Sequence, residues 1–88
     1  MTERQSAAIK GLEASYVGLA CVDWAEKITN EREILEREME IAKKYGDLNE
    51  VIRITARMVV ASEIMNMVSD ISDRAKEETE NVRSQLGI

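Results

Sequence analysis

The chain has 88 residues and contains no proline, phenylalanine or histidine, while 33% of its residues are charged and 44% are hydrophobic. This length predicts one domain, and the absence of proline together with abundant Glu, Ala, Met and Arg favours helices. The 17 acidic and 12 basic residues give a net charge of −5, which disfavours nucleic-acid binding because phosphate contacts need clustered Lys and Arg. No apolar run approaches the roughly 18 residues of a membrane-spanning helix, so we expect no membrane partner.

A first helix is predicted for about residues 3–45. Asn30, with Glu33 three residues later, is a pattern that can start a new helix, but the apolar spacing continues from Ile28 to Leu35. We therefore expect one continuous helix. Its large apolar residues recur at helical spacing, and we expect them to pack on the second helix: Ile9, Leu12, Tyr16, Leu19, Trp24, Ile28, Leu35, Ala42 and Tyr45.

A second stripe of this helix consists only of small residues. We call the following residues the small-residue stripe: Ala7, Gly11, Ala14, Gly18, Cys21 and Ala25. Glycine costs about 1 kcal/mol in a helix relative to alanine, but small residues let two backbones approach closely. Because the sequence predicts no third helix, we expect the partner to be a second copy. Cys21 is then a contact residue, and a lone cysteine favours a reducing, cytoplasmic location.

The segment that follows predicts a turn between two helices. Lys43 and Lys44 complement the negative end of a helix dipole. Gly46 suits the left-handed residue that ends a helix. Asp47 is the predicted N-cap of the next helix, with Glu50 as its capping-box partner. We therefore expect a turn at residues 46–47.

A second helix is predicted for about residues 48–86. One stripe follows a heptad pattern and should pack on the first helix: Val51, Ile54, Met58, Ala61, Met65, Val68, Ser72, Ala75, Thr79, Val82 and Leu86. Further apolar residues lie off that stripe: Ile52, Val59, Val60, Ile64, Met67 and Ile71. A helix that is apolar around most of its circumference needs more than one neighbour. We assign these residues, with the small-residue stripe, to an interface between copies.

These elements predict an all-α fold in which residues 1–88 form a single helical-hairpin domain. Two helices of about 40 residues joined by a tight turn become antiparallel neighbours. Counting outward from the turn places Leu35 near Met58 and Ile28 near Met65. The surplus apolar surface predicts that two hairpins form a homodimeric four-helix bundle.

Two glutamates, Glu31 and Glu38, fall within the apolar stripe of the first helix. We expect Ser62 and Thr55 to lie across from them. A polar layer of this kind within an apolar contact fixes register and oligomeric state at some cost in stability. We assign that role to the two glutamates in preference to metal binding.

Carboxylates are the only candidates for chemistry, because the chain lacks histidine and its cysteine has no apparent activator. Two motifs each place paired acids on one helical face: Glu33-x-x-Glu36 and Asp70-x-x-Asp73. With these motifs the chain resembles the all-helical MazG-type nucleotide pyrophosphohydrolases, which implies magnesium binding and nucleotide hydrolysis. Arg32 stands where that family has paired glutamates. We favour a solvated face with ion pairs such as Glu33–Arg37, and we assign no catalytic, cofactor-binding or metal residue.

We therefore expect a non-enzymatic acidic protein that associates with itself and with another protein, as a scaffold, adaptor or regulatory inhibitor. One alternative is a nucleotide hydrolase that uses carboxylates and a divalent metal. A second alternative is a dimeric helical hairpin that binds nucleic acid through a basic face. The surplus apolar surface favours the first of these three functions.

Overall fold

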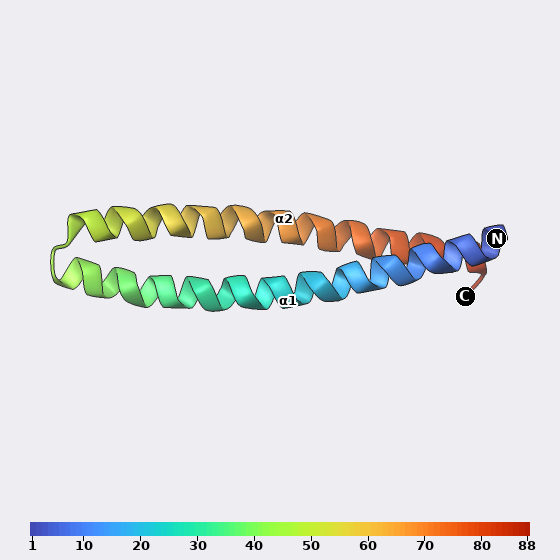
Figure 1. Ribbon diagram of the computed structural model, residues 1–88, viewed down its shortest axis with the longest axis horizontal. Coiled ribbons are helices and arrows are strands. Elements are labelled where there is room, and N and C mark those ends of the chain that lie inside the picture. Colours follow the sequence, from blue (N-terminus) through green and yellow to red (C-terminus); the bar gives the residue numbers. More distant parts are fainter.

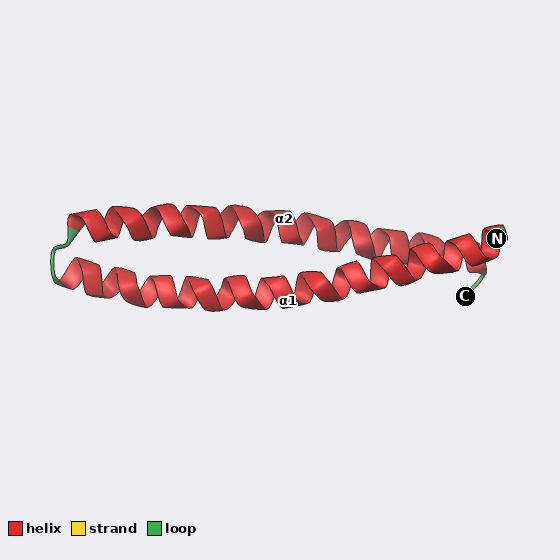
Figure 2. Ribbon diagram, in the orientation of Figure 1, coloured by secondary structure: helices red, strands yellow, loops and turns green.

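The computed structural model describes all 88 residues and contains two helices, α1 over Glu3–Lys44 and α2 over Leu48–Leu86. The helices run antiparallel along each other, so both termini lie at the end opposite the turn (Figure 1). All regular structure is helical (Figure 2), and the molecule is a rod of 64 × 18 × 15 Å. The predicted all-α hairpin is confirmed, and α1 continues through Asn30 without a break.

Both ends of α1 are capped by local hydrogen bonds. At the start, the Thr2 side chain accepts a hydrogen bond from the Gln5 backbone N–H, and the Gln5 side chain accepts one from the Thr2 N–H. This reciprocal pair is a capping box. At the other end, Gly46 N–H donates to the Lys43 carbonyl and Asp47 N–H donates to the Ala42 carbonyl. These two bonds form a Schellman motif, which ends the helix.

The turn forms around Gly46 as predicted, with one difference in its capping. Gly46 has φ +65°, the left-handed conformation that favours glycine. Asp47 is the N-cap of α2, and its carboxylate accepts a hydrogen bond of 3.1 Å from the Glu50 N–H. The expected capping box is only half formed, because the Glu50 carboxylate pairs at 3.0 Å with Arg53, one turn further along α2.

The contact between α1 and α2 repeats every seven residues. The buried residues of α1 are Ala14, Cys21, Ile28, Leu35 and Ala42, and those of α2 are Ile54, Ala61, Ala75 and Val82. This spacing is the heptad repeat of a coiled coil. The best-packed part lies near the turn, where Leu35, Ala42 and Ile54 contact Met39, Val51 and Met58.

The structure corrects the prediction of which face of α1 packs on α2. The seven-residue repeat continues from Leu35 and Ile28 to Cys21 and Ala14, so the small-residue stripe lies inside the hairpin. Ile28, Leu35 and Ala42 pack on α2 as expected. The other large residues expected there are exposed: Ile9, Leu12, Tyr16, Leu19, Trp24 and Tyr45. The expectation failed before Ile28 because Trp24 and the large residues that precede it do not lie on the seven-residue repeat of Leu35 and Ile28. The contact between the helices keeps this repeat, so it passes through small residues instead.

The two glycines of the small-residue stripe differ in their surroundings. A Cβ added to Gly11 would lie 2.8 Å from Cγ1 of Val82, so the backbone of α1 approaches α2 closely at this point. A Cβ added to Gly18 would have no neighbour within 4 Å. The close approach that we assigned to a second copy is therefore made at Gly11 by α2 of the same chain.

This difference predicts opposite effects of the same substitution. Gly18→Ala should raise the free energy of unfolding by up to about 1 kcal/mol, since helix propensity improves without a clash. Gly11→Ala should lower it, because the displacement of Val82 costs about 1–3 kcal/mol and exceeds the gain in propensity. Urea unfolding of both variants at one protein concentration measures the difference. Equal stabilisation by both substitutions would contradict the close contact at Gly11.

The turn gives a second prediction. Gly46→Val should lower the free energy of unfolding by about 1 kcal/mol or more, because a β-branched side chain is strained at φ +65°. Gly46→Asn should cost less, since asparagine tolerates the left-handed conformation. Thermal unfolding of the two variants and the unmodified chain tests this order, and a neutral valine variant would show that the turn adopts another conformation in solution.

Candidate interaction surface

The two broad sides of the hairpin carry different side chains. On both helices, positions three and six residues after a buried residue of the heptad repeat point to one side, which we call the apolar face. From α1 it contains Val17, Trp24, Ile34 and Ile41. From α2 it contains Val60, Ile64, Met67 and Ile71. On α2 these side chains follow one another at intervals of four, three and four residues, which makes a second apolar stripe. On α1 they are seven or ten residues apart, and the positions between them hold Ala20, Lys27, Glu31 and Glu38.

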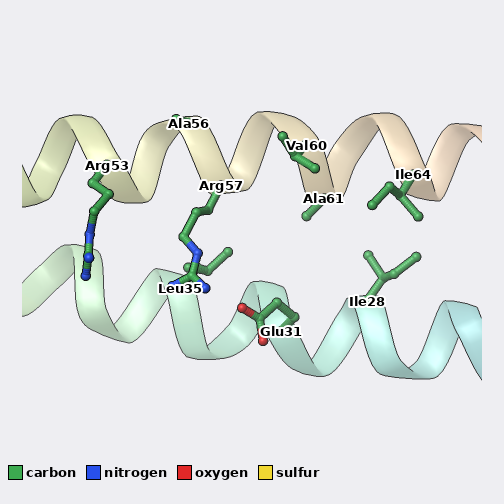
Figure 3. Close-up of a pocket in the computed structure, with 9 residues that line it drawn as sticks. All are labelled: Ile28, Glu31, Leu35, Arg53, Ala56, Arg57, Val60, Ala61 and Ile64. Atoms are coloured by element: carbon green, nitrogen blue, oxygen red, sulfur yellow. The ribbon is translucent and has the colours of Figure 1, made fainter.

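The centre of the apolar face is an open groove between the helices (Figure 3). It has a volume of about 430 Å³, and the apolar residues along it are Ile28, Leu35, Ala56, Val60, Ala61 and Ile64. Figure 3 shows Ile28 of α1 pointing toward α2, and Arg53 and Arg57 extending from α2 toward α1. Glu31 also lines the groove. The groove is therefore apolar, with two arginines toward its turn-proximal end and Glu31 between Leu35 and Ile28.

Solvent reaches most of the apolar face in the single hairpin. Val60 is 57% exposed, Met67 is 61% exposed and Ile64 is 38% exposed, while Ile71 is half-buried. On α1, the ammonium group of Lys27 lies 5.3 Å from the centre of the Trp24 ring, a cation–π contact that partly covers this ring. A run of exposed large apolar side chains is typical of an interaction site.

The opposite side of the hairpin mixes acidic and polar residues with exposed apolar ones. Its positions follow each buried residue by one or five places, and its acidic residues are Glu26, Glu33, Glu36, Glu40, Asp73 and Glu80. Shallow hollows on this side are lined by small or polar residues such as Ser15, Ser69 and Lys76. Five large apolar residues also lie on this side and are exposed: Leu12, Leu19 and Val22 of α1, and Ile52 and Val59 of α2.

The residues predicted for an interface between copies thus fall into three places. The small-residue stripe lies in the contact between α1 and α2, where Ala14 and Cys21 are buried and Ala7, Gly11, Gly18 and Ala25 are half-buried. Val60, Ile64, Met67 and Ile71 lie on the apolar face. Ile52 and Val59 lie on the acidic side. The structure does not bring the small-residue stripe and the apolar residues of α2 together on one surface.

Sequence reasoning missed the contribution of α1 to the apolar face. Val17, Trp24, Ile34 and Ile41 were either assigned to the hairpin contact or not assigned. The signal in the sequence is weak, because these residues are seven or ten apart and fill only every second or third position of one helical stripe. It was hidden because Lys27, Glu31 and Glu38 interrupt the apolar stripe.

The carboxylates give no sign of a catalytic or metal centre. No three side chains of Cys, Asp and Glu lie close enough to hold one metal ion. Glu33, Glu36, Asp70 and Asp73 are exposed. The expected pair Glu33–Arg37 does not form, since Glu50–Arg53 is the only ion pair in the chain. Glu31 and Glu38 are also exposed, so the expected polar layer is not part of the hairpin contact.

Neither helix is apolar over a stretch long enough to cross a membrane. Comparisons of the chain with protein-family models, with curated proteins and with solved structures find no match. The geometry of the two faces is therefore the basis for any functional inference.

The position of Cys21 in the hairpin contact gives a third prediction. Its thiol is free and 7% exposed. In the folded protein it should react with a bulky disulfide reagent at least about tenfold more slowly than in denaturant, because the reagent must wait for the helices to separate. A solvent-exposed control, Asn49→Cys with Cys21→Ala, should react quickly in both conditions. Equal rates for Cys21 would show that another face of α1 packs on α2.

Proposed function

We propose that this chain is a non-enzymatic helical protein that acts by associating with itself and with another protein, as a scaffold, adaptor or regulatory inhibitor. The observation that carries this proposal is the exposure of Val60, Ile64 and Met67 in the middle of α2. Side chains of this size stay in water in the single hairpin, and their burial against a partner contributes about 25 cal/mol per Å² of apolar area.

The small core supports the same proposal. Only 9 of 88 residues are buried in the hairpin, and the largest fully buried side chains are Leu35 and Ile54. Chains that bury little apolar surface commonly gain stability by oligomerisation. A second hairpin packed on the apolar face would complete a four-helix bundle, in which α2 has the second neighbour that its apolar circumference requires.

A bundle of this kind would leave the acidic side on the outside. Its carboxylates, with Ile52 and Val59 among them, would then be free to contact another protein. A charged rim around apolar side chains is the usual composition of a protein–protein interface. The hydrolase and nucleic-acid alternatives have no comparable support, because the acids are dispersed and no basic cluster forms.

The fourth prediction tests self-association through a matched pair of variants. Light scattering at micromolar concentration should give the unmodified chain a mass of at least twice 9.9 kDa. Met67→Glu should shift the equilibrium to the monomer by about tenfold or more, since it places a charge in the apolar contact. Asn66→Glu, which adds the same charge to the next residue on the acidic side, should have little effect. A helical monomer at every concentration would overturn the proposal.

A further inference from the structure

We propose that the second copy packs antiparallel on the apolar face, with its turn at the opposite end of the bundle. The two-fold axis then passes midway between Lys27 and Glu31 of α1 and between Ile64 and Met67 of α2. This inference rests on the proposed self-association and names its geometry. Two observations carry it: the order of charged and apolar residues along α1, and the register between the two helices of one chain.

The stripe that α1 contributes is complementary to itself when it is reversed. In an antiparallel pair of identical helices, residues equally far from the axis on either side face each other. With the axis level with Thr29, Lys27 faces Glu31 of the second copy, and Glu31 faces Lys27. Trp24 faces Ile34 in the same arrangement, and Val17 faces Ile41. Every charge at the centre is paired with its opposite, and every large apolar residue meets another.

The register of the hairpin places the same axis on the apolar part of α2. Gly11 lies beside Val82. Moving along α1 from Gly11 to Thr29 corresponds to moving the same number of residues back along α2 from Val82 to Ile64. The axis deduced from α1 alone therefore crosses α2 within one turn of the midpoint between Ile64 and Met67. The two helices supply independent estimates of one axis, and the estimates agree.

Around the same axis, α2 of one chain packs on α2 of the second copy. Ile64 faces Met67 of the second copy, and Val60 faces Ile71, so the exposed side chains at the centre bury one another. Further out, Arg53 faces Glu78 of the second copy. One like-charge contact remains, between Arg57 and Arg74 of the second copy.

The remaining like-charge contact has a partner within reach. Glu38 of α1 lies within one turn of the level of Arg57, and its side chain is exposed on the apolar face. In the antiparallel dimer it lies close to both Arg57 and the second copy's Arg74. A carboxylate between two guanidinium groups offsets their repulsion.

The other two-fold arrangement puts both turns at the same end and fits less well. In that arrangement α1 lies over α2 of the second copy at the same level along the rod. Glu31 then faces Ile64, and Lys27 faces Met67, so both charges lose water and gain no oppositely charged group from the second copy. Each keeps only the other, one turn along α1. Taking charges out of water is unfavourable unless new charged or hydrogen-bonding partners form. The antiparallel arrangement avoids this cost at the centre of the interface.

A charge-reversal experiment tests the pairing of Lys27 with Glu31 between copies. Lys27→Glu alone places two Glu–Glu contacts at the axis, and Glu31→Lys alone places two Lys–Lys contacts there. Each variant should dimerise at least about tenfold more weakly than the unmodified chain in sedimentation equilibrium. An equimolar mixture of the two variants should recover association to within about threefold, because every contact at the axis is then Glu–Lys.

The mixture separates contacts between copies from contacts within one helix. Lys27 and Glu31 are four residues apart on α1, so each single variant also creates a like-charge pair within its own helix. That repulsion persists in the mixture, and recovery can come only from pairing across the interface. Circular dichroism of each variant controls for loss of helix.

A distance measurement tests the placement of the turns. Spin labels on Asn49→Cys, in a chain that also carries Cys21→Ala, lie near the turn of each copy. The antiparallel dimer places the two labels about 50 Å apart, because each lies about 16 residues from the axis at 1.5 Å per residue. Turns at the same end would give a distance under about 30 Å, which would overturn the proposed geometry.

The outcomes distinguish this inference from the function on which it rests. If the unmodified chain is monomeric, the proposed self-association fails, and the geometry fails with it. If the unmodified chain dimerises but the mixture of variants does not recover association, self-association stands and the antiparallel pairing is wrong. Recovery in the mixture together with the long distance between labels supports both.

Discussion

The heptad contact between α1 and α2 determines which residues remain available for function. Because Ala14, Cys21 and Ile28 face α2, the residues three and six places further along α1 must point to one side of the rod. The same rule applies to α2, so the apolar stripes of both helices come together on one face. The other face carries acidic residues of both helices, together with polar and apolar ones. The division of the molecule into two unlike sides follows from the register of this single contact.

Much of the architecture followed from local signals in the sequence. The Lys-Lys-Tyr-Gly-Asp turn, the left-handed Gly46 and the N-cap Asp47 depend on neighbouring residues only, and these features were predictable. The heptad stripe of α2 was also predictable, because its apolar residues keep one spacing from Val51 to Leu86. These features require no knowledge of the partner helix.

The packing face of α1 was not predictable in the same way. Large apolar residues occur on several sides of α1, so hydrophobicity alone favoured Trp24 over Cys21. The choice depends on α2, whose Val82 side chain leaves room for glycine and not for a larger residue at Gly11. Two helices of this length pack along one continuous seven-residue repeat, and small residues that keep the repeat are preferred to large ones that leave it. The assignment of the candidate interface was affected by the same error.

The size of the residues along the hairpin contact has a consequence for motion. Leu35, Ile54 and Met58 pack near the turn, whereas Gly11, Ala14 and Ala75 form the contact near the termini. Smaller side chains bury less apolar area per turn, so the free energy of local opening should decrease from the turn toward the chain ends. The two helices are therefore held together most stably next to the turn. The two termini separate first, and amide hydrogens exchange in a gradient along the rod.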